Sequence, residues 1–592
     1  MPIGFNELIC HDFLSIYFSF IIILVSIPVF IYSIGYIKEY KTHYSEKYIW
    51  IIMLLFVISM LGVCLSNDAV YFIAFWELMS AFSFLLVIYD YRSKENIKSG
   101  IMYFIMTHIS GLFLIIMFVI ISKYTGSTAF HTIVNNSKNL SYIEKSIIIV
   151  FALIAFGSKA GLIPLHAWLP KAHPSAPSNI SALMSGVMLK VAIYGFIRVT
   201  LTLVGNIPES LALFIISIGT ITAIFSIINA LFQNDIKKLL AYSSAENIGI
   251  IFATIGLSIL LKNYGFSKLS ILTLSAALFH SLNHGIFKSL LFSCAGSVLY
   301  ATNTKNMNEL GGLHKKMRLT AICAFIGTAA TSAIPPLNGF ASEILIFKNF
   351  IESASLINRP SIIAFILLCG ILLALTSGGV IWASVKCFGI TFLGEPRTSK
   401  AQKINPIPRT MNIGMSLLSA LTILLGVLSP FIIVFINNSL SRLFNINSSL
   451  TIYTYGLELT IVSGILISIG LIIYGLSSLS ATEKTEAYNT WGCGFNDFKP
   501  YMQYSASGFT QPAVRIFGSI SAFKKEVKIK EVISLRQKFE DIIHKYIYLT
   551  IATFIDYIAQ KIIKIHFGKI QIYISYIFIS LVLTIILVLK FV

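Results

Sequence analysis

The stretch IVFALIAFGSKAGLIPLHAWLP, residues 149–170, is as apolar as a membrane-spanning helix, but it contains a lysine and a proline. A second long apolar stretch, TAICAFIGTAATSAIPPLNGFASEILIFKNF at 320–350, has Pro335 and Pro336 inside it. Proline removes a main-chain hydrogen bond, and its ring clashes with the preceding turn. Pro164 and the later proline pair therefore predict two helices that break inside a bilayer, where irregular backbone is tolerated only if protein or water lines it.

The composition indicates a membrane protein throughout. Of 592 residues, 56% are hydrophobic and 12% charged, whereas soluble proteins carry about 25% charged residues. Because about 20 apolar residues cross the hydrocarbon, the sequence predicts an all-α polytopic fold with about 14 transmembrane helices. They are expected near 13–36, 49–66, 69–89, 101–122, 147–169, 180–204, 211–232, 238–260, 270–300, 319–352, 361–388, 411–437, 451–478 and 569–592.

The loops between these spans differ in positive charge. Those on one side contain 17 Lys and Arg residues and those on the other side contain 7. The positive-inside rule therefore predicts an N-terminus outside the cell (inner) membrane. Basic cytoplasmic loops facing anionic lipid account for much of the net charge of +19, and no nucleic-acid-binding motif is present. The N-terminus has no Lys or Arg before its first apolar run, so a retained span is expected rather than a cleaved signal peptide.

The two proline breaks lie five spans apart, and an odd separation reverses the topology. Interrupted spans in corresponding halves are typical of transporters built from inverted repeats. The expected organisation is an N-terminal span at 1–48, a first inverted five-helix repeat at 49–204, a second at 211–390, additional spans at 391–478, a cytoplasmic segment at 479–568 and a C-terminal span at 569–592.

The cytoplasmic segment mixes charged and apolar residues. Residues 523–567 read FKKEVKIKEVISLRQKFEDIIHKYIYLTIATFIDYIAQKIIKIHF. Their spacing favours a C-terminal amphipathic surface helix, because basic amphipathic helices lie in the membrane interface. The alternative is a strap that docks along this protein or a neighbour.

Seven ionisable residues lie inside predicted spans, where a charge at a helix centre costs about 2.5–3.5 kcal/mol. They are Glu77, Lys159, Lys190, His280, His284, Lys288 and Glu343. Burial moves such groups toward a pKa at which they exchange protons, so the set predicts a proton pathway. By contrast, Lys348 and Lys386 near span ends are expected to snorkel, and Asp68 and Glu246 are interpreted as interface residues.

The two histidines and Lys288 recur every four residues, which places them on one helix face over about 12 Å. Two histidines at i and i+4 are also the geometry of a zinc helix, but the Glu of HExxH is missing and no third ligand is near. None of the seven cysteines forms a CxxC pair, so no cofactor is expected in this chain. There is also no phosphate-binding loop or dinucleotide fingerprint.

Several motifs together resemble a known family. They are FWELMS, FGSKAGLIPLHAWLPKAHPSAPSNISALMSGVMLKVAIYG, LFQNDIKKLLAYSSAENIGII, HSLNHGIFKSLLF and IPPLNGFASE. In this order, over about residues 49–390, they resemble the antiporter-like membrane subunits of complex I and of Mrp-type cation/proton antiporters. The later stretch WGCGFNDFKPYMQYSASGFTQPAVRIFG resembles the large membrane subunit of formate hydrogenlyase and related group 4 hydrogenases (hydrogenase-4 component B type).

The resemblance implies roles for the buried residues. Glu77 would pair with Lys159 and set its proton affinity, because Coulomb coupling at 4 Å is of order 4 kcal/mol at a dielectric of 20. Lys190 would be the next lysine inward, His284 and Lys288 would be central, and Glu343 would be the exit. Many relatives carry two further helices before the first span, which puts lipid packing or a partner contact at that edge in question.

The predicted function is a proton-translocating, non-redox membrane subunit of a membrane-bound hydrogenase or related complex-I-like oxidoreductase. Its partners would be other membrane subunits and peripheral subunits carrying iron–sulfur clusters and nickel–iron. One alternative is an Mrp-type secondary cation/proton antiporter subunit, since H⁺ alone and H⁺ against Na⁺ need the same residues. Others are a structural membrane anchor and a membrane metalloenzyme.

Overall fold

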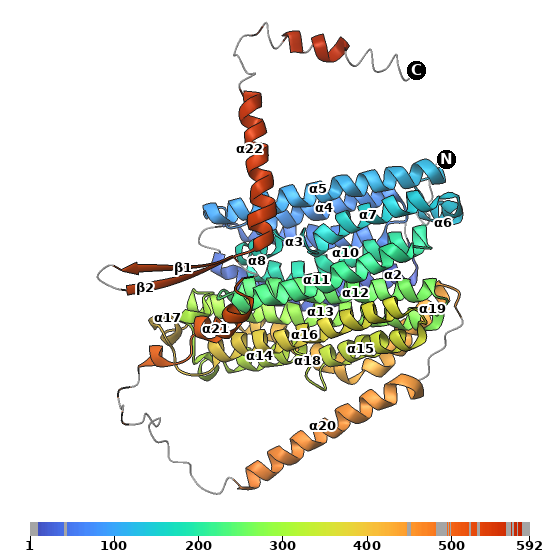
Figure 1. Ribbon diagram of the computed structural model, residues 1–592. Coiled ribbons are helices and arrows are strands. Elements are labelled where there is room, and N and C mark those ends of the chain that lie inside the picture. The colour runs from blue at the N-terminus through green and yellow to red at the C-terminus, as the bar shows by residue number, and fades with distance from the viewer. Residues whose placement is uncertain are drawn as a thin grey trace. The chain divides into compact units, whose positions relative to one another are not determined.

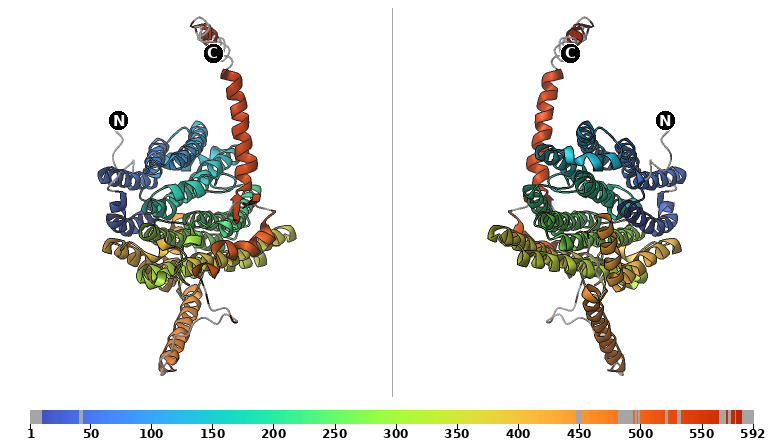
Figure 2. Two further views of the ribbon diagram at one scale, coloured as in Figure 1. Left: turned by 90° about the vertical axis from the view of Figure 1, so that its left-hand side faces the viewer. Right: turned by 90° about the vertical axis from the view of Figure 1, so that its right-hand side faces the viewer.

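The computed structural model describes residues 10–40, 44–446, 452–480, 494, 497, 499–519, 522–529, 533–563, 570, 574–576 and 578–582. The chain divides into two compact units, Met1–Phe517 and Gly518–Val592. In the first unit the helices within residues 13–443 lie side by side as a bundle (Figure 1), which Figure 2 shows turned by 90°.

Ten helices of the described residues are long and apolar enough to cross a membrane. They are α2 with η1 (Phe13–Tyr40), α3 (Glu46–Leu65), α4 (Ala69–Val87), α5 (Lys94–Thr125), α9 to η4 (Ser178–Val204), α11 (Glu209–Phe232), α12 (Ile236–Asn263), α13 (Ser267–Thr302), α16 (Pro360–Phe392) and α18 (Arg409–Val427).

The remaining expected spans are divided or lie partly outside the described residues. The two proline-interrupted spans are split, as predicted, into α7 (Tyr142–Ala160) with α8 (Leu169–Ser175) and α14 (Arg318–Thr331) with α15 (Asn338–Leu356). The span expected at 411–437 divides into α18 and α19 (Ser429–Leu443). The span at 451–478 corresponds to α20 (Ile452–Ser480), and most of 569–592 lies outside the described residues.

Both breaks have a local cause. After α7, Gly161 adopts φ +88°, a left-handed conformation that ends helices and favours glycine; Pro164 then lies in the non-helical stretch before α8. After α14, Ala333 has φ +51°, and Pro335 and Pro336 follow before α15 begins at Asn338.

The centre of the first unit is formed by α12 and α13. Their most apolar windows are 100% and 89% buried, against 28% for α16. A Cβ added to Gly219 of α11 would lie 2.5 Å from the backbone nitrogen of Ala253, and one added to Gly249 of α12 would lie 2.5 Å from that of Ala223. Glycine at these two positions therefore lets α11 and α12 pack backbone to backbone.

The loops form two groups. At one end, Lys305 lies 3.5 Å from the Asp235 carboxylate and donates to the Pro174 carbonyl at 3.2 Å. In the other group, Arg359 donates to Glu209 at 2.8 Å. These contacts join three of the loops assigned to the side richer in Lys and Arg and two of those assigned to the other side.

The prediction of an amphipathic helix over residues 523–567 is wrong for the first half of this segment. The second unit contains an antiparallel hairpin of β1 (Ala522–Ile529) and β2 (Ile533–Glu540), followed by η8 (His544–Tyr548) and α22 (Leu549–Ile563). The physical reason is the period of the sequence. Both strand segments alternate polar and apolar residues, and Val527 pairs with Leu535 and Ile529 with Ile533, so a period of two overrides the helical interpretation.

Candidate functional site

Glu77 lies in the middle of α4 with its carboxylate against α5. Its Oε2 atom is 3.6 Å from Nε2 of His108, and the two side chains are 31% and 41% exposed. Its Oε1 atom is buried and makes no hydrogen bond within the described residues. Opposite it is Gly111, where an added Cβ would lie 2.0 Å from Oε1. The absence of a side chain at 111 therefore makes room for the Glu77 carboxylate.

Lys159 occupies the last turn of α7, directly before the break, and is fully buried. Its Nζ atom donates to Ser80 Oγ at 2.9 Å and to Tyr103 Oη at 3.0 Å. A neutral amine makes both bonds with its two N–H groups, whereas an ammonium has one N–H left over. Ser80 is nearly one turn from Glu77 on α4, but no ion pair within 4 Å joins Lys159 and Glu77 in the described structure.

Lys190 is buried at the start of α10 (Leu189–Ile197) and donates to the carbonyl of Ser185 at 2.6 Å. Ser185 belongs to the π-helix η3 (Met184–Met188), a type of wide turn frequent at functional sites. The added Cβ of Gly285 on α13 would lie 2.8 Å from the Gly186 carbonyl and 3.7 Å from Cε of Lys190. The two glycines thus bring Lys190 against α13.

The predicted ladder lies on α13, a continuous helix of 36 residues. The rings of His280 and His284 are nearly parallel, with centroids 6.5 Å apart. Both ring nitrogens of His284 are buried with no hydrogen-bond partner in the part of the chain described. Lys288, one turn further, donates to Ser243 Oγ of α12 at 2.6 Å.

His280 connects α12 to α15. Its Nε2 atom lies 3.1 Å from Asn247 Oδ1, and its Nδ1 atom lies 2.9 Å from Ser342 Oγ. An amide oxygen only accepts hydrogen bonds, so Nε2 carries a proton. Asn247 in turn donates to Glu246 Oε2 at 2.5 Å.

The interpretation of Glu246 as an interface residue is wrong. Its side chain is 1% exposed in the interior of α12, because α13 and α15 cover the face that carries Ser243, Glu246 and Asn247. The sequence contained a signal for this buried polar face, because Ser243, Glu246 and Asn247 follow the helical spacing i, i+3 and i+4 within an apolar helix. His108, within the predicted span 101–122, was also missed, although it too is an ionisable group in an apolar run.

Glu343 lies on α15 next to Ser342 and is 7% exposed. Ser377 of α16 donates to its Oε2 atom at 3.1 Å. The second broken helix therefore supplies two neighbouring polar side chains, of which Ser342 contacts His280 and Glu343 faces α16.

Lys386 does not snorkel; the expectation for this residue is also wrong. It is fully buried, and its Nζ atom donates to the Leu231 carbonyl at 2.8 Å, the Gln233 carbonyl at 2.6 Å and Thr510 Oγ1 at 2.7 Å. Thr510 belongs to α21 (Ala506–Phe517), which packs over the end of α11 and shields the ammonium from lipid and water. Three acceptors match the three N–H groups of a fixed ammonium, whereas Lys159 has two acceptors.

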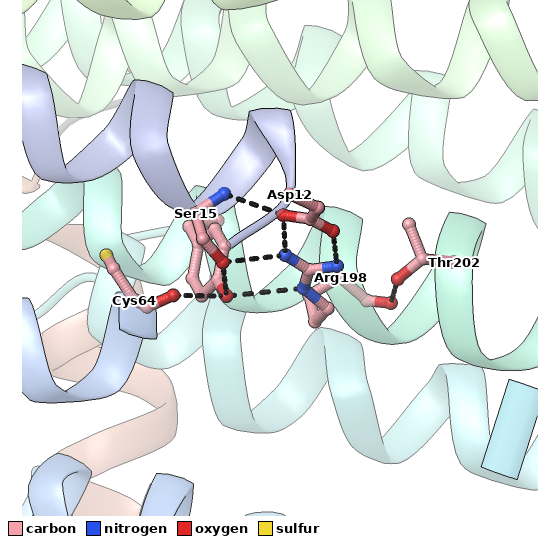
Figure 3. A network of polar contacts seen from close by, with 6 residues as sticks. Asp12, Ser15, Cys64, Arg198 and Thr202 are labelled. Carbon is pink, nitrogen blue, oxygen red and sulfur yellow. Dashed lines mark hydrogen bonds and ion pairs between the residues drawn. The ribbon is translucent and has the colours of Figure 1, made fainter. Parts of the chain in front are cut away.

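A second polar network lies at the other end of the bundle (Figure 3). Arg198, 4% exposed, forms a two-pronged ion pair with Asp12, which caps α2. It also donates to Ser15 Oγ at 2.9 Å and to Tyr194 Oη at 3.2 Å. A pocket of about 390 Å³ adjoins this pair, lined partly by Asp12, Arg198 and His131.

Within the described residues, no group of three or more His, Cys, Asp or Glu side chains is arranged to hold a metal ion. The helical bundle, the two interrupted helices and the buried ionisable side chains define a multi-pass membrane protein with a polar interior.

This chain belongs to the NADH:quinone oxidoreductase/Mrp antiporter transmembrane family, whose sequence model matches residues 66–374. It is 31% identical to hydrogenase-4 component B of Escherichia coli (strain K12) over 99% of this chain and 90% of that protein. It is 30% identical to Na(+)/H(+) antiporter subunit A1 of Staphylococcus haemolyticus (strain JCSC1435), over 86% of this chain and 64% of that protein.

Among solved structures, a chain of the membrane-bound sulfane sulfur reductase, an archaeal respiratory membrane complex, superimposes with a TM-score of 0.78 and 26% identity. The match covers 96% of this chain and 88% of that one. The predicted resemblance to antiporter-like and hydrogenase-type membrane subunits is confirmed.

Proposed function

We propose that this chain is the proton-translocating, non-redox membrane subunit of a membrane-bound hydrogenase or related complex-I-like oxidoreductase, coupling electron transfer in partner subunits to ion pumping. The observation that supports this most is a series of ionisable side chains in the helices, all of them buried except Glu77, which is partly exposed. Its members are Glu77, Lys159, Lys190, His284, Lys288, His280 and Glu343. Each costs free energy in a membrane interior, and together they form a series of sites for one proton at a time.

The hydrogen bonds support transfer in the second half of this series. Lys288 contacts Ser243 of α12, and His280 joins Asn247 to Ser342, the neighbour of Glu343. His284 has two buried ring nitrogens with no protein partner in the described structure. Since buried polar atoms are satisfied by protein or ordered water, water molecules complete the route between Lys190, His284 and Lys288.

The finer architecture is proposed as two inverted five-helix repeats within about 14 transmembrane helices. In each set of five, the fourth helix is broken, the second carries a glutamate (Glu77 or Glu246) and the fifth carries a buried lysine (Lys190 or Lys386). The N-terminus would lie outside a cell (inner) membrane, because the loops richer in Lys and Arg gather at the opposite end.

The test is proton uptake into inverted vesicles that contain the assembled complex. Glu77→Gln and Lys159→Ala should abolish uptake while subunit assembly and partner electron transfer survive, and Lys403→Ala on an exposed loop is the matched control. Uptake at the control level by both variants would overturn the pathway.

The partners would be other membrane subunits and peripheral subunits carrying iron–sulfur clusters and nickel–iron. Mass spectrometry of the complex purified in mild detergent tests this. Co-purification of only small antiporter subunits would instead favour the second candidate function.

That second candidate is an Mrp-type secondary cation/proton antiporter subunit, favoured by the alignment of 86% of the chain with a Na(+)/H(+) antiporter subunit. It predicts sodium flux driven by a pH gradient without any reductant. Flux that requires electron transfer would support the leading proposal.

A further inference from the structure

Glu77 has a partner that the family resemblance did not indicate. His108 of α5 approaches its Oε2 atom to 3.6 Å, whereas Lys159 is held by Ser80 and Tyr103 instead. His108 and Lys159 are the charged or titratable groups that act electrostatically on Glu77. Tyr103, the other titratable side chain nearby, is turned toward Ser83 and Lys159. The carboxylate therefore lies between two basic groups on different helices.

The protons of His108 follow from its contacts. Its Nδ1 atom lies 3.1 Å from the carbonyl oxygen of Phe104, which only accepts hydrogen bonds, so Nδ1 carries a proton. The atom that faces Glu77 is then Nε2. At 3.6 Å, Nε2 and Oε2 are within ion-pair range but beyond hydrogen-bond distance. One proton makes the contact favourable: on Nε2 it gives an imidazolium beside the carboxylate, and on Glu77 it removes the carboxylate charge. In both states the pair holds one proton, either on Nε2 or on the Glu77 carboxyl group.

Removing that proton leaves two acceptors facing each other. A carboxylate beside a bare imidazole nitrogen has no ion pair to hold it, and the other basic group that acts on it electrostatically is Lys159. The Glu77 side chain has room to reorient, because Gly111 presents no Cβ to Oε1 and Oε1 has no other hydrogen bond among the described residues.

We propose that His108 and Glu77 form a proton-sharing pair, and that loss of the shared proton releases the Glu77 carboxylate to Lys159. His108 is thus a positioning residue. It determines whether the Glu77 carboxylate interacts with His108 or with Lys159. This deepens the proposed function and rests on it for its role in transport. In this step one proton leaves the pair of His108 and Glu77. The negative charge that remains on the Glu77 carboxylate then stabilises the Lys159 ammonium.

The experiment measures labelling of Glu77 by dicyclohexylcarbodiimide, which adds only to a protonated carboxyl group and reaches membrane-embedded acids. Membranes containing the intact complex are labelled between pH 5 and 9, and the modified peptide is quantified by mass spectrometry. Glu77→Gln removes the signal and identifies it. The variants are His108→Gln, which keeps polarity but cannot carry a positive charge, and His108→Phe, which keeps the ring packing on Phe104, now at a centroid distance of 3.9 Å. His131→Gln, at an exposed position of α6 (Phe130–Asn136), is the control.

Without His108 the shared proton remains on Glu77. Labelling in both His108 variants should therefore persist to a pH about one unit higher than in the wild type, a tenfold change in the ratio of acid to carboxylate. The control should follow the wild-type curve. Wild-type labelling curves in both variants would overturn the proton-sharing pair.

The labelling does not depend on transport, so the two proposals fail separately. A shifted curve together with full proton uptake by Glu77→Gln would leave the pair intact and refute its role in pumping. An unshifted curve with abolished uptake would refute the pair and leave the pathway standing.

Discussion

Gly111→Ala should weaken proton translocation without changing any ionisable group. The new Cβ would lie 2.0 Å from Glu77 Oε1, and real Cβ contacts are essentially never below 3.0 Å, so the carboxylate must move by about 1 Å or more. The atom that moves is the end of a flexible side chain. Folding should therefore be unaffected or slightly improved, since alanine is favoured over glycine in helices by up to about 1 kcal/mol.

The functional magnitude comes from the contact that is displaced. Unit charges separated by the 3.6 Å between Oε2 and His108 Nε2 interact by about 4–5 kcal/mol at a dielectric of 20. Both side chains are partly exposed, so screening reduces this to about 1 kcal/mol. Since 1.36 kcal/mol corresponds to a factor of ten, proton uptake should fall by about three- to tenfold.

The assay is fluorescence quenching by a pH-sensitive dye in inverted vesicles at matched complex content, with partner electron transfer measured in parallel. Gly378→Ala on α16 is the control, because an added Cβ there meets nothing within 4 Å. Equal uptake by the two glycine variants would refute the reasoning that Glu77 acts from its position beside Gly111.

Three further results are expected. Lys386→Met removes the ammonium that joins the Leu231 and Gln233 carbonyls to Thr510 of α21, so α21 should be cleaved by trypsin at least several times faster than in Lys403→Met. Burial raises the pKa of Asp12, but the Arg198 guanidinium outweighs it and keeps that pKa below its usual value. The stability that Asp12 contributes is therefore present above about pH 4 and lost as the pH falls through the lowered pKa of the folded state; Asp12→Asn should lower the melting temperature at pH 7, and by less and less as the pH falls below about 4. Glu246→Gln should reduce proton uptake by about tenfold or more while the complex assembles, because it removes a buried charge; normal uptake would exclude Glu246 from the route.

Some residues of the site could be predicted from the sequence because ionisable side chains and prolines are rare inside membrane-spanning helices. A lysine such as Lys159 in an apolar run costs free energy in lipid, so its presence indicates a function. Prolines in two corresponding spans predict broken helices whatever the tertiary packing. The i, i+4 spacing of His280, His284 and Lys288 fixes their common face on a helix, since 3.6 residues make one turn.

Other features needed the fold. A hairpin of β1 and β2 replaces the expected helix because a short charged segment fits both a period of 3.6 and a period of two, and strand pairing decides between them. Lys386 lies near the end of a span, where snorkelling is the usual outcome, but α21 covers it from a distant part of the sequence.

By itself, the sequence determined a multi-pass helical membrane protein with two interrupted helices and a set of buried ionisable residues, because apolar length, proline chemistry and the cost of charge in lipid are local properties. Only the tertiary structure decided which groups meet. Glu77 lies beside His108, Lys159 beside Ser80 and Tyr103, and His280 between α12 and α15, because helix packing brings together residues far apart in the sequence.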